Sequence, residues 1–176
     1  MKKVLFLIIM MFSFLASVNS QEIVKNEIDD FTGNRVIETS WEKLAWGLGV
    51  PSGIYTRIRS INGTMVLDMK YMIDDAVVIG KGDKLMFLDT NKKPYEVHSI
   101  DTYMGVKGGG AIGLAGSAVW GIHAQYSGDL GFLNTSTIQK IRIYTTKGYY
   151  DKEIKKKYQN TLQELYKLVI KASIMR

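Results

Sequence analysis

The sequence predicts an α+β fold, in which one long C-terminal helix packs on a mostly antiparallel β-sheet of about six to eight strands. Two observations support this prediction: apolar and polar residues alternate in several short segments, and the last segment has helical periodicity instead. Strands and helices do not alternate along the chain, which argues against a doubly wound parallel sheet. A closed barrel or β-sandwich with an appended helix is the alternative architecture.

The clearest element is a hairpin in the first half of the chain. Residues 54–61 alternate, Asn62-Gly63 is a favoured type I′ turn pair, and residues 64–72 alternate again. One face of the second strand is apolar and consists of Met65, Leu67, Met69 and Tyr71. A sheet with one covered face accounts for this pattern.

Further segments are rich in β-branched and aromatic residues and predict additional strands. They are 35–41, 76–79, 84–88, 95–101, 120–126 and 141–145. We expect 84–88 to pair with 76–79 on one side and with 95–101 on the other. Residues 21–31 are polar and acidic and predict a loose lead-in, and residues 46–53 predict a loop.

The last element is predicted as an amphipathic helix over residues 151–173, with Asp151 as its N-cap. One stripe of residues recurs at intervals of three or four along it: Ile154, Tyr158, Leu162, Leu165, Val169 and Ala172.

Residues 1–20 have the three-part layout of a secretory signal peptide. Lys2 and Lys3 precede an apolar run over 4–15, and small residues then lead to a cleavage position before Gln21. The run is shorter than the ~20 residues that span a bilayer, so an uncleaved anchor is the weaker interpretation. We therefore expect an exported protein, periplasmic or secreted from a Gram-negative bacterium, with a single domain over residues 21–176.

Composition and charge exclude several classes of function for this protein. The chain is 46% hydrophobic, has no cysteine, and carries a formal net charge of +6. The hydrophobic content is too high for a disordered chain, and the lack of cysteine excludes disulfides and thiol chemistry. Most of the excess positive charge lies in residues 140–176, which hold ten basic and three acidic side chains. This modest patch in an exported chain does not predict nucleic-acid binding.

Residues 105–121 form a glycine-rich segment that includes the pattern G-x-G-x-x-G at 108–113. Gly116 and Gly121 lie where a dinucleotide-binding helix would run, so we expect no such cofactor. The simplest interpretation is a structural loop. The alternative is a surface that contacts a partner or a membrane through its apolar members Ile112, Leu114 and Trp120.

No catalytic or metal-binding set emerges from the sequence. The two histidines, His98 and His123, are too few for a zinc site, and we expect no metal and no cofactor. The acidic pairs at 29–30 and 74–75 are typical of solvated turns, and Ser117 lacks a nucleophile elbow. An enzyme would have to assemble its site in three dimensions, and a periplasmic hydrolase of this kind is the alternative function.

The basic residues Lys152, Lys155 and Lys156 crowd the start of the predicted helix, together with Lys157. A solvated helix face is the simplest interpretation. The functional alternative is attraction to an anionic surface such as lipid headgroups, lipopolysaccharide or acidic glycans. The candidate partner-binding residues are therefore Ile112, Leu114, Trp120, Lys152, Lys155 and Lys156.

Three stretches, 30–41, 82–86 and 141–146, together resemble small exported proteins of unknown function from Bacteroides-type bacteria. The resemblance covers most of the chain after residue 20 and implies a location outside the cytoplasm. It supplies no catalytic or binding residues. We expect a non-enzymatic exported domain that binds a protein partner or a cell-envelope component.

Overall fold

The computed structural model describes residues 21–49, 51–107 and 120–175. Within these ranges the fold is a mostly antiparallel sheet with one C-terminal α-helix, as predicted. The strands are β1 (Ile23–Ile28), β2 (Arg35–Thr39), β3 (Glu42–Trp46), β4 (Gly53–Ile61), β5 (Thr64–Ile73), β6 (Val78–Ile79), β7 (Lys84–Asp89), β8 (Pro94–Ser99), β9 (Tyr103–Met104), β10 (Val106–Lys107), β11 (Trp120–Ser127), β12 (Ile138–Thr145) and β13 (Gly148–Glu153). The helices are α2 (Thr161–Ile174) and two short 3₁₀ turns, η1 (Gly131–Asn134) and η2 (Lys156–Tyr158).

The sheet is larger than the six to eight strands that the sequence predicts. Among the described residues, eleven strands form one sheet and β6 pairs with β9 in a second sheet. Three strands lie in segments predicted otherwise, and one of them is β10 in the predicted glycine-rich loop. Most β1 side chains are exposed, so its sequence lacks an apolar face, and β13 occupies the predicted start of the helix. The predicted pairing of 76–79 with 84–88 is wrong, because β8 and β12 occupy both edges of β7.

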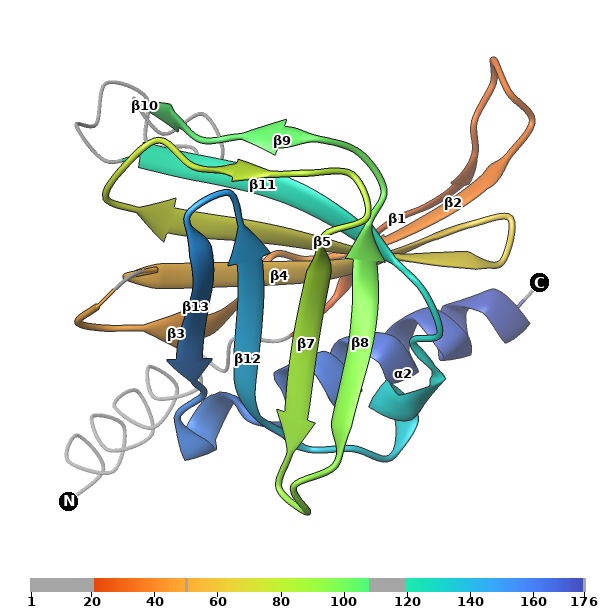
Figure 1. Cartoon of the computed structure of the whole chain (residues 1–176). Coiled ribbons are helices and arrows are strands. Elements are labelled where there is room, and N and C mark those ends of the chain that lie inside the picture. Colours follow the sequence, from red (N-terminus) through yellow and green to blue (C-terminus); the bar gives the residue numbers. More distant parts are fainter. Residues whose placement is uncertain (1–20, 50, 108–119, 176) are drawn as a thin grey trace, which may run out of the picture.

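The large sheet folds over on itself to form two layers (Figure 1). The strands β7, β8, β12 and β13 cross in front of β3, β4, β5 and β11. The chain of hydrogen-bonded strands passes from one layer to the other where β11 pairs with β8. Crossed layers of this kind bury their facing side chains in one core.

The core lies between the layers and under α2. Its centre holds Tyr71 and Tyr126, whose hydroxyl oxygens are 3.1 Å apart. Burial raises the pKa of both phenols well above the ordinary value. Phe87 from the crossing layer is also fully buried.

The predicted hairpin is confirmed as β4 and β5. Ile61 pairs with Thr64, and both turn residues have positive φ, +50° at Asn62 and +86° at Gly63. A type I′ turn requires these angles, which explains the Asn-Gly pair.

The C-terminal helix begins at Thr161, ten residues later than predicted. The preceding segment turns at Gly148, where φ is +100°, and returns along β12 as β13. Asp151 is therefore a strand residue opposite Arg142 and not a helix cap. The helical spacing of Ile154 and Tyr158 is a coincidence, since both pack inward from a backbone that is not α-helical.

The helix α2 packs against β2 and β4, which come from the beginning of the described chain. Arg35 on β2 also donates hydrogen bonds to carbonyl oxygens at the helix C-terminus, from Nη2 to Ala172 (3.0 Å) and to Met175 (3.1 Å). These carbonyls have no partner within the helix, so Arg35 satisfies them. No described helix has the length and apolar character needed to cross a membrane.

Candidate functional site

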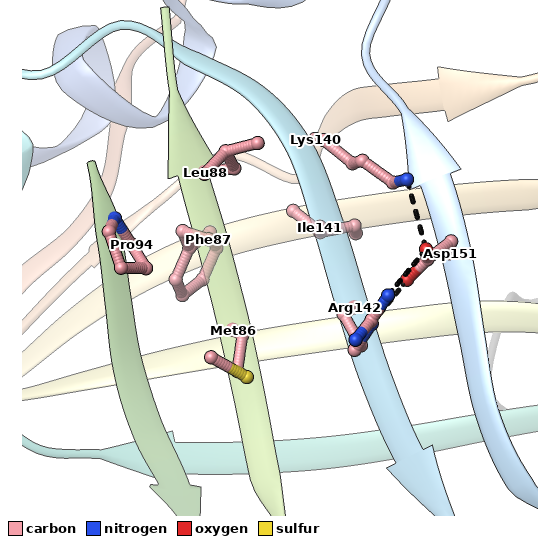
Figure 2. Close-up of a pocket in the computed structure, with 8 residues that line it drawn as sticks. All are labelled: Met86, Phe87, Leu88, Pro94, Lys140, Ile141, Arg142 and Asp151. Atoms are coloured by element: carbon pink, nitrogen blue, oxygen red, sulfur yellow. Dashed lines mark hydrogen bonds and ion pairs between the residues drawn. The ribbon is translucent and has the colours of Figure 1, made fainter. Parts of the chain in front are cut away.

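Two concave regions of the surface are candidates for a functional site. The first, called the hollow below, is a cavity of about 220 Å³ over β7, β8, β12 and β13 (Figure 2). Its lining residues are Met86, Phe87, Leu88, Pro94, Lys140, Ile141, Arg142 and Asp151. Phe87 and Ile141 also belong to the buried core.

The charged side chains of the hollow are paired with one another. Arg142 donates two hydrogen bonds to Asp151, from Nε at 2.6 Å and from Nη2 at 2.8 Å. Lys140 Nζ lies 2.9 Å from the same carboxylate, as Figure 2 shows. Hydrogen bonds from Arg142 and Lys140 lower the pKa of Asp151 to about 2. Together these contacts satisfy the carboxylate within the protein.

The second region, called the groove below, is a cavity of about 500 Å³ beside β3 and the start of α2. It is lined by Gln21, Trp41, Glu42, Lys43, Tyr55, Lys157, Tyr158, Thr161 and Glu164. These residues come from five segments: the stretch before β1, the β2–β3 region, β4, η2 and α2. The groove therefore exists only after both ends of the described chain have come together.

The two lysines of the groove are not paired with acids. Neither Lys43 nor Lys157 lies within ion-pair distance of a carboxylate in the described part of the chain. Each ammonium instead lies near aromatic rings: Lys43 Nζ is 5.3 Å from the ring centre of Trp46, and Lys157 Nζ is 4.8 Å from that of Tyr158. Exposed cation–π contacts contribute only about 0.5–1 kcal/mol, so a ligand could recruit both ammonium groups at small cost.

The two acids of the groove each accept one hydrogen bond from a neighbouring side chain. Ser40 Oγ donates to Glu42 at 2.7 Å, and Gln21 Nε2 donates to Glu164 at 2.8 Å. A carboxylate has about four acceptor positions, so both retain capacity for a ligand.

Trp41 forms one wall of the groove and is held by residues of the outer sheet face. The ring centre lies 4.1 Å from Lys70 Nζ and 4.8 Å from the guanidinium carbon of Arg57. The His123 ring meets the indole edge-on at 5.3 Å. Burial and the neighbouring Arg57 lower the pKa of Lys70.

Asp68 is the centre of the ion-pair network behind Trp41. Its side chain is 0% exposed and accepts hydrogen bonds from Arg57 Nε at 2.7 Å, Arg59 Nη2 at 2.9 Å and Gln125 Nε2 at 3.1 Å. Arg57 also donates from Nη1 to Glu38 at 2.7 Å. The network thus joins β2, β4, β5 and β11 and supports Arg57 under Trp41.

The two histidines lie apart and line neither the hollow nor the groove. His123 Nε2 is 4.0 Å from Asp68 Oδ2, and burial is the main cause that lowers the pKa of His123. His98 Nε2 is 3.8 Å from Glu96 Oε1 on the other layer. Within residues 21–49, 51–107 and 120–175, no group of three or more histidine or acidic side chains could hold a metal ion.

Of the six candidate residues that the sequence predicts, the structure describes four. Ile112 and Leu114 lie outside the described residues. Trp120 is half-buried against the core at the start of β11 and is not an exposed apolar side chain. Part of its ring stays at the surface, and its role in partner binding stays a prediction, because residues 108–119 lie outside the described chain.

None of the three predicted lysines lies on an α-helix: Lys152 is on β13, Lys156 begins η2, and Lys155 directly precedes η2. Lys152 belongs to β13 and donates from Nζ to the carbonyl oxygen of Leu48 at 2.9 Å. Burial and the nearby Lys155 lower the pKa of Lys152. Lys155 and Lys156 are exposed and directly precede Lys157, which lines the groove. The basic segment therefore adjoins the groove.

Most of the groove was not predicted from the sequence. Trp41, Glu42 and Lys43 are consecutive and combine an aromatic ring, an acid and a base. This combination could have indicated a binding surface. Nothing in the sequence indicated that Glu164 would face them.

The comparisons with known proteins supply no relatives from which a function could be transferred. No protein-family model matches the chain, and neither a curated protein nor a solved structure matches it.

Proposed function

We propose that this chain is an exported, non-enzymatic binding domain and that it holds a component of the cell envelope in the groove. The observation that carries the proposal is the pair of unpaired lysines, Lys43 and Lys157, in a cavity with aromatic walls. Charges that have no partner within a protein are free to bind a ligand.

The surroundings of the groove favour an envelope component with negative charge. Lys155 and Lys156 are exposed next to Lys157 and place additional positive charge at the edge of the cavity. Such a patch attracts anionic partners over roughly one Debye length, about 8–10 Å at physiological salt. A protein partner is the other occupant that the sequence suggests, but a concave cavity of this volume suits a small ligand or a chain end better.

Export is part of the proposal. Its support is the layout of residues 1–20 together with the resemblance to exported proteins of Bacteroides-type bacteria. Mass spectrometry of the protein recovered from the periplasm or the medium tests it. We expect a chain that begins at Gln21, and recovery of the full-length chain from the cytoplasm alone would contradict export.

Binding is tested by sedimentation of the purified chain with envelope fragments at low and high salt. We expect retention that falls as salt rises and that decreases about tenfold in the double variant Lys43→Gln, Lys157→Gln. Lys167→Gln, on an exposed position of α2, is the matched control and should behave as the unchanged protein. Equal retention of all three proteins would refute a role for the groove.

A hydrolase is the second candidate, and one observation favours it. Glu42 from β3 and Glu164 from α2 both line the groove, and glycosidases use two carboxylates from separate elements. Glu164 is exposed, however, whereas the general acid of such enzymes lies in an apolar environment. Binding is therefore the better-supported function. Release of reducing sugar ends from envelope polysaccharide, abolished in Glu42→Gln and in Glu164→Gln, would instead establish the hydrolase.

A further inference from the structure

From the same groove we infer the chemical class of the ligand: a short oligosaccharide whose rings stack on aromatic side chains of the groove and whose hydroxyl groups bind both its acids and its lysines. This inference rests on the proposed function and makes it more specific. It follows from the kinds of polar group in the lining, from the aromatic rings, and from the size and flanks of the cavity.

The polar groups of the lining favour a ligand that both donates and accepts hydrogen bonds. The two lysines can only donate, and the two glutamates, when ionised, can only accept. Their formal charges cancel within the lining. A simple anion would bind the lysines but face two carboxylates, and a simple cation would face two ammonium groups. A hydroxyl group satisfies both kinds of partner, and saccharides carry one on most of their carbon atoms.

The aromatic walls favour a ligand with flat C–H faces. Trp41, Tyr55 and Tyr158 all line the groove. An aromatic ring has a negative face, and the C–H bonds of a sugar ring present weakly positive hydrogens to it. Lys43 Nζ and Lys157 Nζ now lie over ring faces, 6.0 Å from the centre of Tyr55 and 4.8 Å from that of Tyr158. An entering sugar ring would displace the ammonium groups, which can then donate to its hydroxyls.

The size of the cavity and the charge beside it refine the inference. A volume of about 500 Å³ lies within the range of roughly 300–1,000 Å³ that is usual for small-ligand sites. It therefore suits a few sugar units and not an extended macromolecular surface. Lys155 and Lys156 lie beside the lined region, so an oligosaccharide with carboxylate groups should bind more tightly than a neutral one.

The inference is tested by titrating the purified chain with soluble tetrasaccharides. Cellotetraose, chitotetraose and tetragalacturonic acid are suitable probes, and calorimetry together with tryptophan fluorescence provides the readout, since Trp41 lines the groove. We expect saturable binding of at least one probe, with the acidic probe the tightest and the most salt-sensitive.

Ring variants locate the site. Tyr158→Ala should weaken binding about fivefold to tenfold, whereas Tyr158→Phe, which keeps the ring, should remain within about twofold. Tyr149→Ala is the matched control, because Tyr149 is an exposed ring on β13, where it stacks on Arg142 of the hollow. Tyr55→Ala provides an independent second ring variant. Thermal unfolding of each variant identifies any loss of binding that comes from misfolding.

The outcomes separate this inference from the proposed function. If envelope fragments bind but no tetrasaccharide does, the inference of an oligosaccharide ligand is overturned and the proposed binding function stands. If vesicles with phosphatidylglycerol compete for the envelope-binding site and sugars do not, a lipid headgroup replaces the sugar and the inference is wrong. If Tyr149→Ala weakens binding as much as Tyr158→Ala and Tyr55→Ala, the sugar does not bind in the groove and the inference is again overturned. If envelope fragments do not bind either, the proposed function fails with it.

Discussion

The hollow and the groove are both concave, and both contain lysine and acidic side chains, but these charges have different partners. In the hollow, Arg142 and Asp151 are opposite each other in the register of β12 and β13, so strand pairing itself brings them together. In the groove, the charged residues come from β3, η2 and α2, and no register pairs Lys43 or Lys157 with an acid. Charges paired within the protein stabilise a surface, whereas unpaired charges in a cavity are available to a ligand.

A second ion-pair network surrounds Asp68. Comparing it with the network of the hollow tests how burial changes the contribution of ion pairs to the free energy of unfolding. Asp68 is fully buried under the wall of the groove, whereas the Asp151 side chain in the hollow is 27% exposed. We expect Asp68→Asn to lower the free energy of unfolding by about 3 kcal/mol, because two arginines lose a buried partner. The value is at the low end for buried pairs, since Glu38 still binds Arg57. Urea denaturation measures it.

Asp151→Asn is the matched control for this experiment. Its ion pairs are close to solvent, so we expect a loss of no more than about 1 kcal/mol. Equal losses in Asp68→Asn and Asp151→Asn would show that burial does not distinguish the two networks. Asp68→Asn should also expose Trp41 to acrylamide quenching, because Arg57 loses a hydrogen-bond partner beneath the indole.

Acid should weaken the stabilising contribution of the Asp151 ion pairs in a defined pH range. The pKa of Asp151 is about 2 in the folded protein, against an ordinary value of 3.8. A carboxyl with a lowered pKa in the folded state stabilises the protein above its unfolded pKa, and this contribution is lost as the pH falls from about 4 to about 2. We expect the difference in stability between the unchanged protein and Asp151→Asn to shrink over this range. A constant difference from pH 6 to pH 2 would be evidence against the contribution of the ionised pair.

The smallest expected effect is that of Lys157→Gln on stability. Its ammonium group has no acidic partner among the described residues, so we expect a change within about 0.5 kcal/mol. Arg142→Gln removes the bidentate contact with Asp151 and should lower the free energy of unfolding by about 1 kcal/mol. Thermal unfolding of both variants gives the comparison. A larger loss in Lys157→Gln would mean that the lysine stabilises the fold and is not held free for a ligand.

Local patterns predicted the fold class and the central hairpin, because these depend on neighbours in sequence. The alternation in β5 and the Asn62-Gly63 turn were sufficient to predict the pairing of β4 with β5. The start of the helix was not predictable in this way. Ile154 and Tyr158 pack inward at a helical spacing, and only the turn at Gly148 reveals that the preceding residues return as a strand.

The groove was not predictable, because it depends on contacts between distant parts of the chain. Trp41 and Tyr158 are more than one hundred residues apart and line one cavity. Asp68 is a polar residue on the outer face of an alternating strand, a position that normally indicates solvent exposure. Arginines from the neighbouring strand cover it, and a single sequence gives no indication of this burial.

The position of α2 has a consequence for the order in which the molecule can assemble. This helix ends the described chain, yet it packs on β2 and β4 and receives Arg35 at its C-terminus. Because β2 and β4 are synthesised well before α2, their apolar face is covered only after α2 has been made. Such high contact order slows folding. A newly made chain that completes its core only once α2 is available would suit the export proposed above, because a translocation channel threads an unfolded chain.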